Sequence, residues 1–378
     1  MKLIHLSDLH IGKRVHAFSM ISDQKYILNE ILKLIGREQP DAVLIAGDIY
    51  DKPVPSAEAV EVFDGFLVAL SEIKIPVFLI SGNHDSAERL AFASRILKDS
   101  RIYVSPVYRG EIRPVRLQDH KGEVCIYMLP FVRPAQVKAQ YPEAEIETYN
   151  DAVRTAVSHM HVDPEKRNVL LTHQFVTGAQ ACESEELSVG GTDQIDASVF
   201  QDFDYVALGH LHGPQSVTRP TVRYCGTPLK YSFSETAHRK SVTIVQLEEK
   251  GNVTIRTEPL VPLRDMKKIS GTYMEVTDRS FYEGQSREDY FHITLTDEED
   301  IPEAVGRLRA VYPNLMQLEY DNHRTRGGAS LETWETKDQK TPEALFSDFY
   351  KAQNNRDMSP EQQAFLSQII EKIWEEEE

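Results

Sequence analysis

The stretch Asp41-Ala-Val-Leu-Ile-Ala-Gly-Asp-Ile-Tyr-Asp51 decides how this chain folds. Residues 42–46 are uniformly apolar rather than alternating, which indicates a parallel strand that is covered on both faces of a sheet. Gly47 permits a sharp turn, so the Asp48 carboxylate is expected at the carboxyl edge of the sheet, where open α/β sheets bind ligands. A single Gly-Asp turn is more often structural, so the neighbouring strands have to decide the function.

Four other apolar strands end in the same way, with side chains that can bind a cation. The side chains that follow these strands are Asp8 and His10 after the strand that begins at Lys2, Asn83 after residues 76–81, His173 after residues 168–172, and His210 and His212 after residues 204–209. In extended chain, side chains two positions apart point the same way, so Asp-x-His and His-x-His can each reach one ion. We therefore expect these side chains to converge with Asp48 at one sheet edge.

The donors are carboxylate, amide and imidazole groups, a set that suits Mn²⁺, Fe²⁺ or Zn²⁺ better than Ca²⁺ or a thiolate-preferring metal. Seven ligands exceed the needs of one tetrahedral ion and fit two ions that share a bridging carboxylate, for which we propose Asp48. Two divalent ions about 3.5–4 Å apart favour phosphoryl transfer, because together they activate a water molecule and neutralise charge on the phosphate.

The residues next to Asn83 suggest where acid catalysis takes place. His84 adjoins that ligand and is the candidate general acid for the leaving oxygen. Asp85 can either orient His84 or cap a helix that begins at Ser86. The role of Asp51 stays open.

Other histidine and basic positions have weaker patterns. His5 lies inside the first strand and is interpreted as a core histidine, whereas His159 and His161 point to different faces of a predicted helix over 149–161 and make a poor metal pair. Lys230, Arg239 and Lys240 are expected on an exposed loop, as either a phosphate-facing patch or a solvated turn.

The composition narrows the class of protein. The chain has 378 residues and a formal net charge of −17, which argues against a nucleic-acid coat protein. Three widely separated cysteines exclude a disulfide framework and a zinc knuckle. We expect no membrane span and no secretory or lipidation signal, and therefore a cytoplasmic protein.

The order of predicted elements indicates several parts. A large α/β domain spans 1–262, with helices expected over 24–37, 59–70 and 86–98. A small α+β domain spans 270–325, with strands over 272–276, 290–295 and 315–320 and a helix over 302–311. Residues 326–340 form a linker, and residues 341–378 contain two amphipathic helices, over 342–353 and 360–374. Two such short helices are not stable alone, so we expect them to dock, most simply on another chain.

Five motifs follow the apolar strands: Asp8-x-His10, Gly47-Asp48, Gly82-Asn-His-Asp85, His173 and Gly209-His-x-His212. Together they resemble the five-part signature of calcineurin-like metallophosphoesterases. Within that superfamily the chain is most similar to the family of SbcD nuclease subunits, nearly from end to end. The most specific parts of the resemblance are residues 7–12, 47–51 and 226–235.

This resemblance implies a four-layer α/β/β/α sandwich with a small capping domain. It implies one metal ion held by Asp8, His10, Asp48 and His212, another held by Asp48, Asn83, His173 and His210, and Mn²⁺ as the metal. It further implies an SbcC-type ABC ATPase whose coiled-coil base binds the C-terminal helices, and a homodimer, within a heterotetramer, formed through residues 56–70 and 86–98. The implied activity is ATP-dependent 3′-to-5′ double-strand exonuclease and single-strand endonuclease cleavage of DNA, in DNA end processing, repair and recombination.

One departure separates the chain from protein Ser/Thr phosphatases of the same superfamily. Those enzymes follow the Gly-Asp turn with Asp-Arg, whereas this chain has Asp51-Lys52-Pro53 and lacks the arginine that would clamp a phosphoprotein. Two alternatives to a nuclease stay open, a phosphodiesterase for small molecules or cyclic nucleotides and a non-catalytic scaffold. A scaffold would be expected to have lost ligands, and all seven are present.

Overall fold

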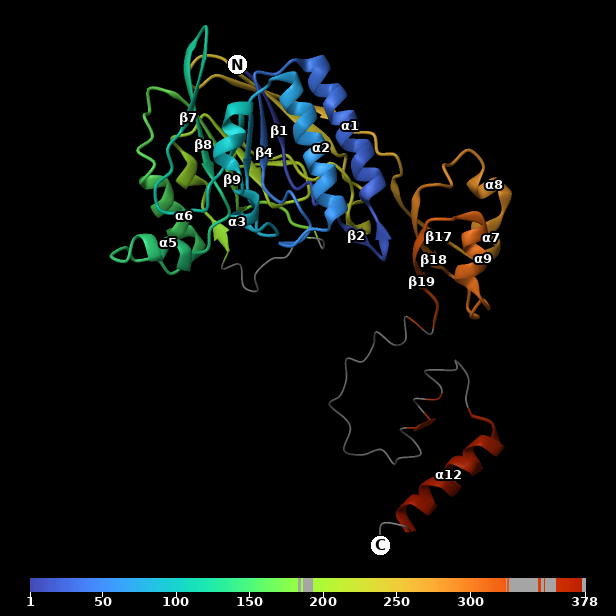
Figure 1. The fold of residues 1–378 in the computed structure, drawn as a ribbon. Helices are drawn as coiled ribbons and strands as arrows, with labels where there is room; N and C mark the ends of the chain where they lie inside the picture. The colour runs from blue at the N-terminus through green and yellow to red at the C-terminus, as the bar shows by residue number, and fades with distance from the viewer. Residues whose placement is uncertain are drawn as a thin grey trace. The chain divides into compact units, whose positions relative to one another are not determined.

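The computed structural model describes residues 1–182, 185, 193–323, 325, 346–347, 350 and 358–375 (Figure 1). Compact contacts divide the chain between Met266 and Lys267 into two units. Among the helices that the structure describes, none combines the length and the apolar character needed to cross a membrane.

The first unit contains two six-stranded sheets. The first sheet has the order β16 (Val253–Pro259), β15 (Ser241–Leu247), β1 (Lys2–Leu6), β4 (Ala42–Ala46), β5 (Val77–Ile80) and β6 (Ile102–Val104). The second has the order β13 (Gln215–Val217), β14 (Arg219–Tyr224), β12 (Tyr205–Gly209), β9 (Arg167–His173), β8 (Gly122–Leu129) and β7 (Val115–Asp119). In each sheet four neighbouring strands run parallel, β1 to β6 and β14 to β8, so their carboxyl ends share one edge.

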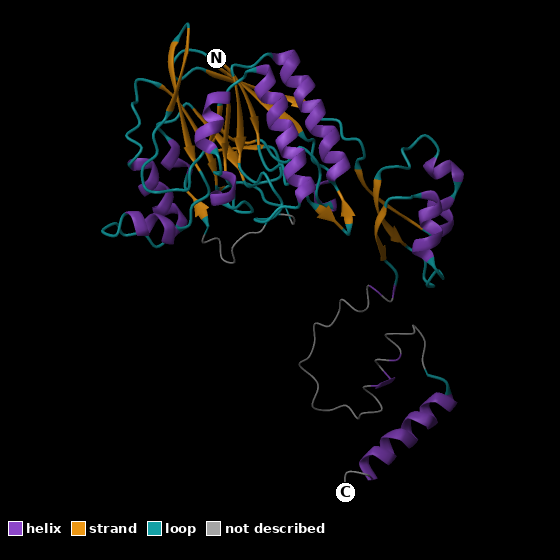
Figure 2. Ribbon diagram, in the orientation of Figure 1, coloured by secondary structure: helices purple, strands orange, loops and turns teal. Residues whose placement is uncertain are grey.

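Helices cover the outer faces of both sheets (Figure 2). The helices of this unit are α1 (Ile21–Glu38), α2 (Ala57–Ile73), α3 (Ala87–Leu90), α4 (Ser94–Leu97), α5 (Pro134–Gln140) and α6 (Tyr149–Ser158). Short pieces complete it: β2 (Arg14–Val15) pairs with β3 (Phe18–Ser19), β10 (Phe175–Val176) pairs with β11 (Gln194–Ile195), and 3₁₀ turns span Lys98–Ser100, Ala197–Phe200 and Phe233–Glu235. The predicted four-layer α/β/β/α arrangement is therefore confirmed.

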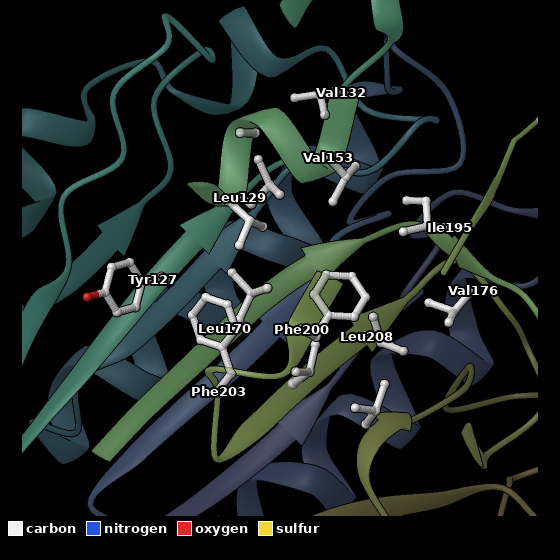
Figure 3. Packing of buried hydrophobic residues seen from close by; sticks show 14 of the residues in the cluster. Tyr127, Leu129, Val132, Val153, Leu170, Val176, Ile195, Phe200, Phe203 and Leu208 are labelled. Carbon is white, nitrogen blue, oxygen red and sulfur yellow. The ribbon is translucent and has the colours of Figure 1, made fainter. Parts of the chain in front are cut away.

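Apolar side chains join the two sheets face to face. Leu44 and Phe78 of the first sheet share one buried cluster with Ile126, Leu171 and Ala207 of the second. A separate cluster fills the space between the second sheet and α5 and α6, and Figure 3 shows its side chains. Strands buried on both faces explain why their sequences are continuously apolar.

The helix predictions have mixed outcomes. The helix expected over 24–37 is confirmed as α1, and the Ser56 hydroxyl caps α2 by accepting from the Ala59 amide at 3.2 Å. The single helix predicted over 86–98 is wrong, because the chain there forms two short helices that are interrupted at Ala93, which has φ +58°. The helix expected over 149–161 ends at Ser158.

The second unit packs helices on a three-stranded sheet of order β17 (Met266–Gly271), β18 (Tyr290–Leu295) and β19 (Leu315–Tyr320). Its helices are α7 (Tyr273–Thr277), α8 (Arg279–Tyr282) and α9 (Ala304–Val311). The strand predicted over 272–276 is wrong, because Thr272 and Glu275 form a capping box that begins a helix there. The strands expected over 290–295 and 315–320 are confirmed.

Near the carboxyl end the structure describes one complete helix, α12 (Pro360–Glu375), where the sequence predicted a helix over 360–374. The predicted linker over 326–340 lies outside the described residues. The predicted helix over 342–353 also lies outside them, apart from three positions.

His5 is a core histidine, as predicted. Its side chain is fully buried, and Nδ1 lies 2.8 Å from the Tyr205 hydroxyl of the second sheet. Burial, reinforced by the nearby Arg223 guanidinium, lowers the pKa of His5 to about 3.

This burial predicts an acid-sensitive fold. Between about pH 6.5 and pH 3 the unfolded chain binds a proton at His5 that the folded chain does not, so stability falls as the pH falls. Between pH 7.5 and pH 5.0 we expect protonation of His5 in the unfolded chain to lower the free energy of unfolding by about 2 kcal/mol. Urea unfolding of metal-free wild type and His5→Asn at both pH values measures it. The variant should lose about 2 kcal/mol less than wild type, and equal losses would contradict the assignment.

Candidate metal centre

The predicted ligands meet where the carboxyl edges of the two sheets come together. Pairing between the chain segments after β1 and β4 continues past the strands, because the Asp8 amide donates to Gly47 O at 3.0 Å and the His10 amide donates to Asp48 O at 2.9 Å. The segments after β5, β9 and β12 complete the rim. The structure therefore brings all seven predicted ligands to one edge.

The backbone at this edge adopts conformations that L-residues rarely adopt. Asp8, His10, Asp48 and His210 have φ values of 53°, 45°, 49° and 109°. Each such residue costs on the order of 1–3 kcal/mol and persists only where the surrounding structure enforces it. Four of the seven predicted ligands are held in this way, so the rim is built for side-chain placement at the expense of stability.

Two glycines allow the close approach that the site requires. A Cβ atom on Gly209 would lie 1.9 Å from Ala46 O, so the two sheets could not come together at this point. A Cβ atom on Gly82 would lie 2.1 Å from Asp48 Oδ1. Both glycines precede predicted ligand segments, and a side chain at either one would push the site apart.

Asp48 lies at the centre of the cluster. Its Oδ2 atom is 3.2 Å from His173 Nε2 and 3.7 Å from His10 Nε2, while its Oδ1 atom accepts from the His84 amide at 2.9 Å. Two groups of side chains share this carboxylate, and within each group the nitrogen and oxygen atoms lie within 4.8 Å of one another. One group is Asp8, Asp48 and His173, all of them predicted ligands. The other is His10, Asp48 and His84, of which His84 is the predicted acid. The geometry matches a carboxylate shared between two cations.

Asn83 joins the second sheet to this cluster. Its Oδ1 atom lies 3.0 Å from both His173 Nε2 and His210 Nδ1. The His210 amide in turn donates to Asp8 Oδ1 at 2.9 Å. On the other side, the rings of His10 and His212 have centroids 5.1 Å apart.

Backbone and carboxylate acceptors define which ring nitrogens are available as ligands. His173 Nδ1 lies 2.8 Å from Ala46 O, and because a carbonyl only accepts, this nitrogen carries a hydrogen. Nε2 is therefore the ring nitrogen that a cation can bind, in place of the proton that Nε2 shares with Asp48 and Asn83. His212 Nδ1 lies 3.0 Å from Glu235 Oε1, and because a carboxylate only accepts, Nε2 is the nitrogen of this ring that is available to a cation.

Buried polar atoms without partners support the assignment of a cation site. Within the part of the chain that the structure describes, Asp8 Oδ2 and both ring nitrogens of His10 have no hydrogen-bond partner. Both residues are almost completely buried. Orphaned donors and acceptors are costly in a protein interior, and a bound cation would satisfy these atoms.

The ionisable side chains at the site shift one another's pKa values. Burial raises the pKa of Asp8 to about 6. Burial acts in the same direction on Asp48, but the neighbouring histidines, His173 foremost, hold the pKa of Asp48 well below its usual range. Although burial opposes protonation of His173, the adjacent Asp48 carboxylate raises the pKa of His173 to about 9. A proton on His173 thus supplies positive charge where a cation would otherwise supply it.

His84 lies at the edge of the cluster and is half-buried. Its Nδ1 atom is 3.2 Å from the backbone carbonyl oxygen of Asp51, and its ring centroid is 4.9 Å from that of His10. The Asp51 side chain instead pairs with Lys13 at 2.9 Å. Asp51 therefore contacts His84 through its backbone.

Asp85 has neither of the two roles considered from the sequence. Its carboxylate accepts from the amides of Ile49, Tyr50 and Gly82 at 3.1, 3.0 and 2.9 Å, whereas Ser86 caps the following helix. Asp85 thus ties the turn after β4 to the turn after β5. Nothing in the local sequence shows this, because two of the three amides lie 36 and 35 positions away.

The expectation for the basic loop needs correction. Lys240 is buried, with 6% of its surface exposed, and pairs with Glu235 at 2.6 Å. Lys230 pairs with Asp265 at 2.9 Å, and Arg239 alone of the three predicted residues is exposed. Sequence reasoning missed Glu235 and Lys240 as neighbours of the site, although Glu235 ends one of the most specific motifs.

Loss of the Asp85 carboxylate should loosen the rim. Asp85→Ala removes three backbone hydrogen bonds from partly buried amides, so we expect a loss of about 2–4 kcal/mol in the free energy of unfolding. Urea unfolding measures this loss, and Glu61→Ala on the exposed face of α2 is the control, with a change within about 0.5 kcal/mol. Equal stability of the two variants would contradict the role assigned to Asp85.

Comparison with known proteins agrees with this geometry. Residues 1–214 match the family described as calcineurin-like phosphoesterase, and residues 262–354 match the type 5 capsule protein repressor C-terminal domain. Two proteins named as the SbcD subunit of the nuclease SbcCD, from Staphylococcus epidermidis and Staphylococcus saprophyticus, are each 31% identical to the chain. They match it over its whole length and over 100% and 99% of their own. The chain is therefore a metal-dependent phosphoesterase of the calcineurin-like family and belongs, within it, to the nuclease subunits of the SbcD family.

Proposed function

We propose that this chain is the nuclease subunit of an ATP-dependent SbcCD-type complex and cleaves phosphodiester bonds of DNA with two metal ions, as a 3′-to-5′ double-strand exonuclease and a single-strand endonuclease. The observation that carries the proposal is the position of Asp48, whose carboxylate lies within 4.8 Å of nitrogen or oxygen atoms of Asp8 and His173 on one side and of His10 and His84 on the other. The proposal assigns the chain to DNA end processing, repair and recombination in the cytoplasm.

In this proposal Asp8, His10, Asp48 and His212 hold one ion, and Asp48, Asn83, His173 and His210 hold the other. Oxygen and imidazole donors without thiolate suit Mn²⁺. Two bound divalent ions supply the activation of water and the neutralisation of phosphate charge that this chemistry requires.

The residues of the chain supply position and a proton. His84 Nδ1 donates to the Asp51 carbonyl, which fixes the ring and leaves Nε2 to carry the proton for the leaving oxygen. The His84 amide also donates to Asp48 Oδ1 at 2.9 Å, which ties the backbone of the candidate acid to the shared carboxylate.

The proposal includes partners for surfaces outside the site. The net charge of −17 fits a protein whose ATPase partner supplies much of the electrostatic attraction to DNA. We assign the C-terminal helices to an SbcC-type ATPase. We assign Val60 and Val68 of α2, together with Phe92 and Ile96, to a homodimer contact, because these apolar side chains are 44%, 49%, 82% and 72% exposed.

His84→Gln tests the chemistry. The variant should keep its full Mn²⁺ content, because Asp48 and the other ligands are untouched, and should lose at least about a hundredfold in Mn²⁺-dependent digestion of end-labelled duplex DNA in the presence of the ATPase. His159→Gln, an exposed histidine outside the site, is the matched control and should retain wild-type activity. Undiminished cleavage by His84→Gln would exclude the proposed acid, and no cleavage by wild type would exclude the nuclease.

Deletion of residues 340–378 tests the partner surface. The shortened chain should fail to bind the ATPase in a pull-down, while Mn²⁺-dependent hydrolysis of a small aryl phosphodiester stays within about twofold of wild type, because the metal ligands lie in the first unit. Capture of the ATPase by the shortened chain would show that the docking segment lies elsewhere. A small-molecule phosphodiesterase would instead turn over nucleotides as an isolated chain and would not need residues 262–378.

A further inference from the structure

Behind His212, a proposed metal ligand, lies a buried carboxylate. Glu235 is completely buried, and its Oε1 atom accepts from His212 Nδ1 at 3.0 Å. Histidines that bind metals usually donate their other ring N–H to a carboxylate or a carbonyl, which fixes the ring and selects the nitrogen that binds the metal. The contact between Glu235 and His212 has this arrangement.

Lys240 holds Glu235 and the backbone of His212 together. Its ammonium group donates to Glu235 Oε2 at 2.6 Å, to Thr227 Oγ1 at 2.6 Å and to the backbone carbonyl of His212 at 2.9 Å. All three of its N–H donors are therefore used, two of them on the atoms that set the position of His212. The Thr227 amide also donates to the His212 carbonyl, at 3.2 Å.

The backbone fits tightly around the same residue. Gly226 has φ +79°, and a Cβ atom there would lie 2.6 Å from the His212 carbonyl oxygen. The segment from Gly226 to Lys240 thus contacts His212 from both its main chain and its side chains. This is the loop that the sequence predicted to be exposed.

A buried ion pair is weak support for stability, because taking two charges out of water costs about as much as their attraction returns. An apolar pair would fill the same space without that cost. The contacts of Glu235 and Lys240 converge instead on one ligand of the metal centre, which indicates that their role is to orient His212.

We propose that Glu235 and Lys240 are positioning residues for the metal ion held by His212. Glu235 keeps His212 in the Nδ1–H tautomer with Nε2 available as the ligand, and Lys240 keeps Glu235 ionised and in place. This inference rests on the proposed function, since it requires His212 to bind metal. It concerns one of the two ions and leaves the ligands of the other unaffected.

Mn²⁺ titration of the full-length protein tests the inference. We expect Glu235→Gln to weaken binding of one Mn²⁺ by about 10- to 100-fold, the range typical when such an orienting partner is lost. The second Mn²⁺ should bind within about threefold of wild type. Calorimetry with electron paramagnetic resonance counting of free Mn²⁺ separates the two ions without any measurement of activity.

Two further variants protect the test against misfolding. Glu235→Gln combined with Lys240→Met leaves no unpaired buried charge and should weaken the same ion. Asp119→Asn removes a comparable ion pair with Arg167, away from the site, and should leave both Mn²⁺ affinities unchanged. Equal weakening by Asp119→Asn would show a general loss of stability and would overturn the proposal.

The wild-type protein offers a second measurement. In ¹⁵N-histidine spectra of the metal-free protein at pH 8, His212 should appear as the Nδ1–H tautomer, with its signals assigned by their absence in His212→Gln. An Nε2–H tautomer would overturn the proposal even if every variant misfolded.

His212→Ala distinguishes a failure of the proposed metal site from a failure of the positioning role of Glu235 and Lys240. If it binds both Mn²⁺ ions as wild type does, the proposed metal site is wrong. If it loses one ion while both Glu235 variants keep full affinity, the metal site stands and the positioning role of Glu235 and Lys240 is wrong.

Discussion

The burial of the Asp48 carboxylate is the constraint on which the rest of the site depends. An ionised carboxylate with 2% exposure is costly unless positive charge and hydrogen-bond donors surround it. The imidazole of His173 and the backbone amide of His84 provide this surrounding. In the absence of a cation, a proton on His173 offsets part of the charge, which explains why its pKa is raised to about 9.

A site around one buried carboxylate requires donors from both sheets. Asp48 belongs to the first sheet and His173 to the second, and the sheets can meet there because Gly209 has no side chain to strike Ala46 O. The left-handed conformations of Asp8, His10, Asp48 and His210 add local strain. The apolar cluster between the sheets offsets these costs. The buried core thus stabilises a fold in which the backbone at the site has unfavourable conformations.

Residues behind the proposed ligands hold them in place. Asp85 ties two turns together, and Gln24 donates to the carbonyl of His10 at 2.8 Å and to the hydroxyl of Tyr231 at 2.9 Å. Glu235 and Lys240 do the same for His212. These residues come from helices and loops spread over the first unit, so much of this unit takes part in holding the site.

The sequence alone determined the apolar strands, the polar residues that follow them and the kind of cation chemistry that those residues support. Each of these depends on side chains that are close along the chain, and periodicity reports such local relations faithfully. The convergence of these side chains was also expected from the sequence, whereas the tertiary structure decided the contacts between them, the break of the 86–98 segment at Ala93 and the helix at 273–277. It also placed Lys240 inside the protein and turned Asp85 toward backbone amides in the turns that follow β4 and β5. These outcomes depend on contacts between residues distant in sequence, such as the contact between Ala46 and His173, which are 127 positions apart. A local sequence pattern cannot predict such contacts.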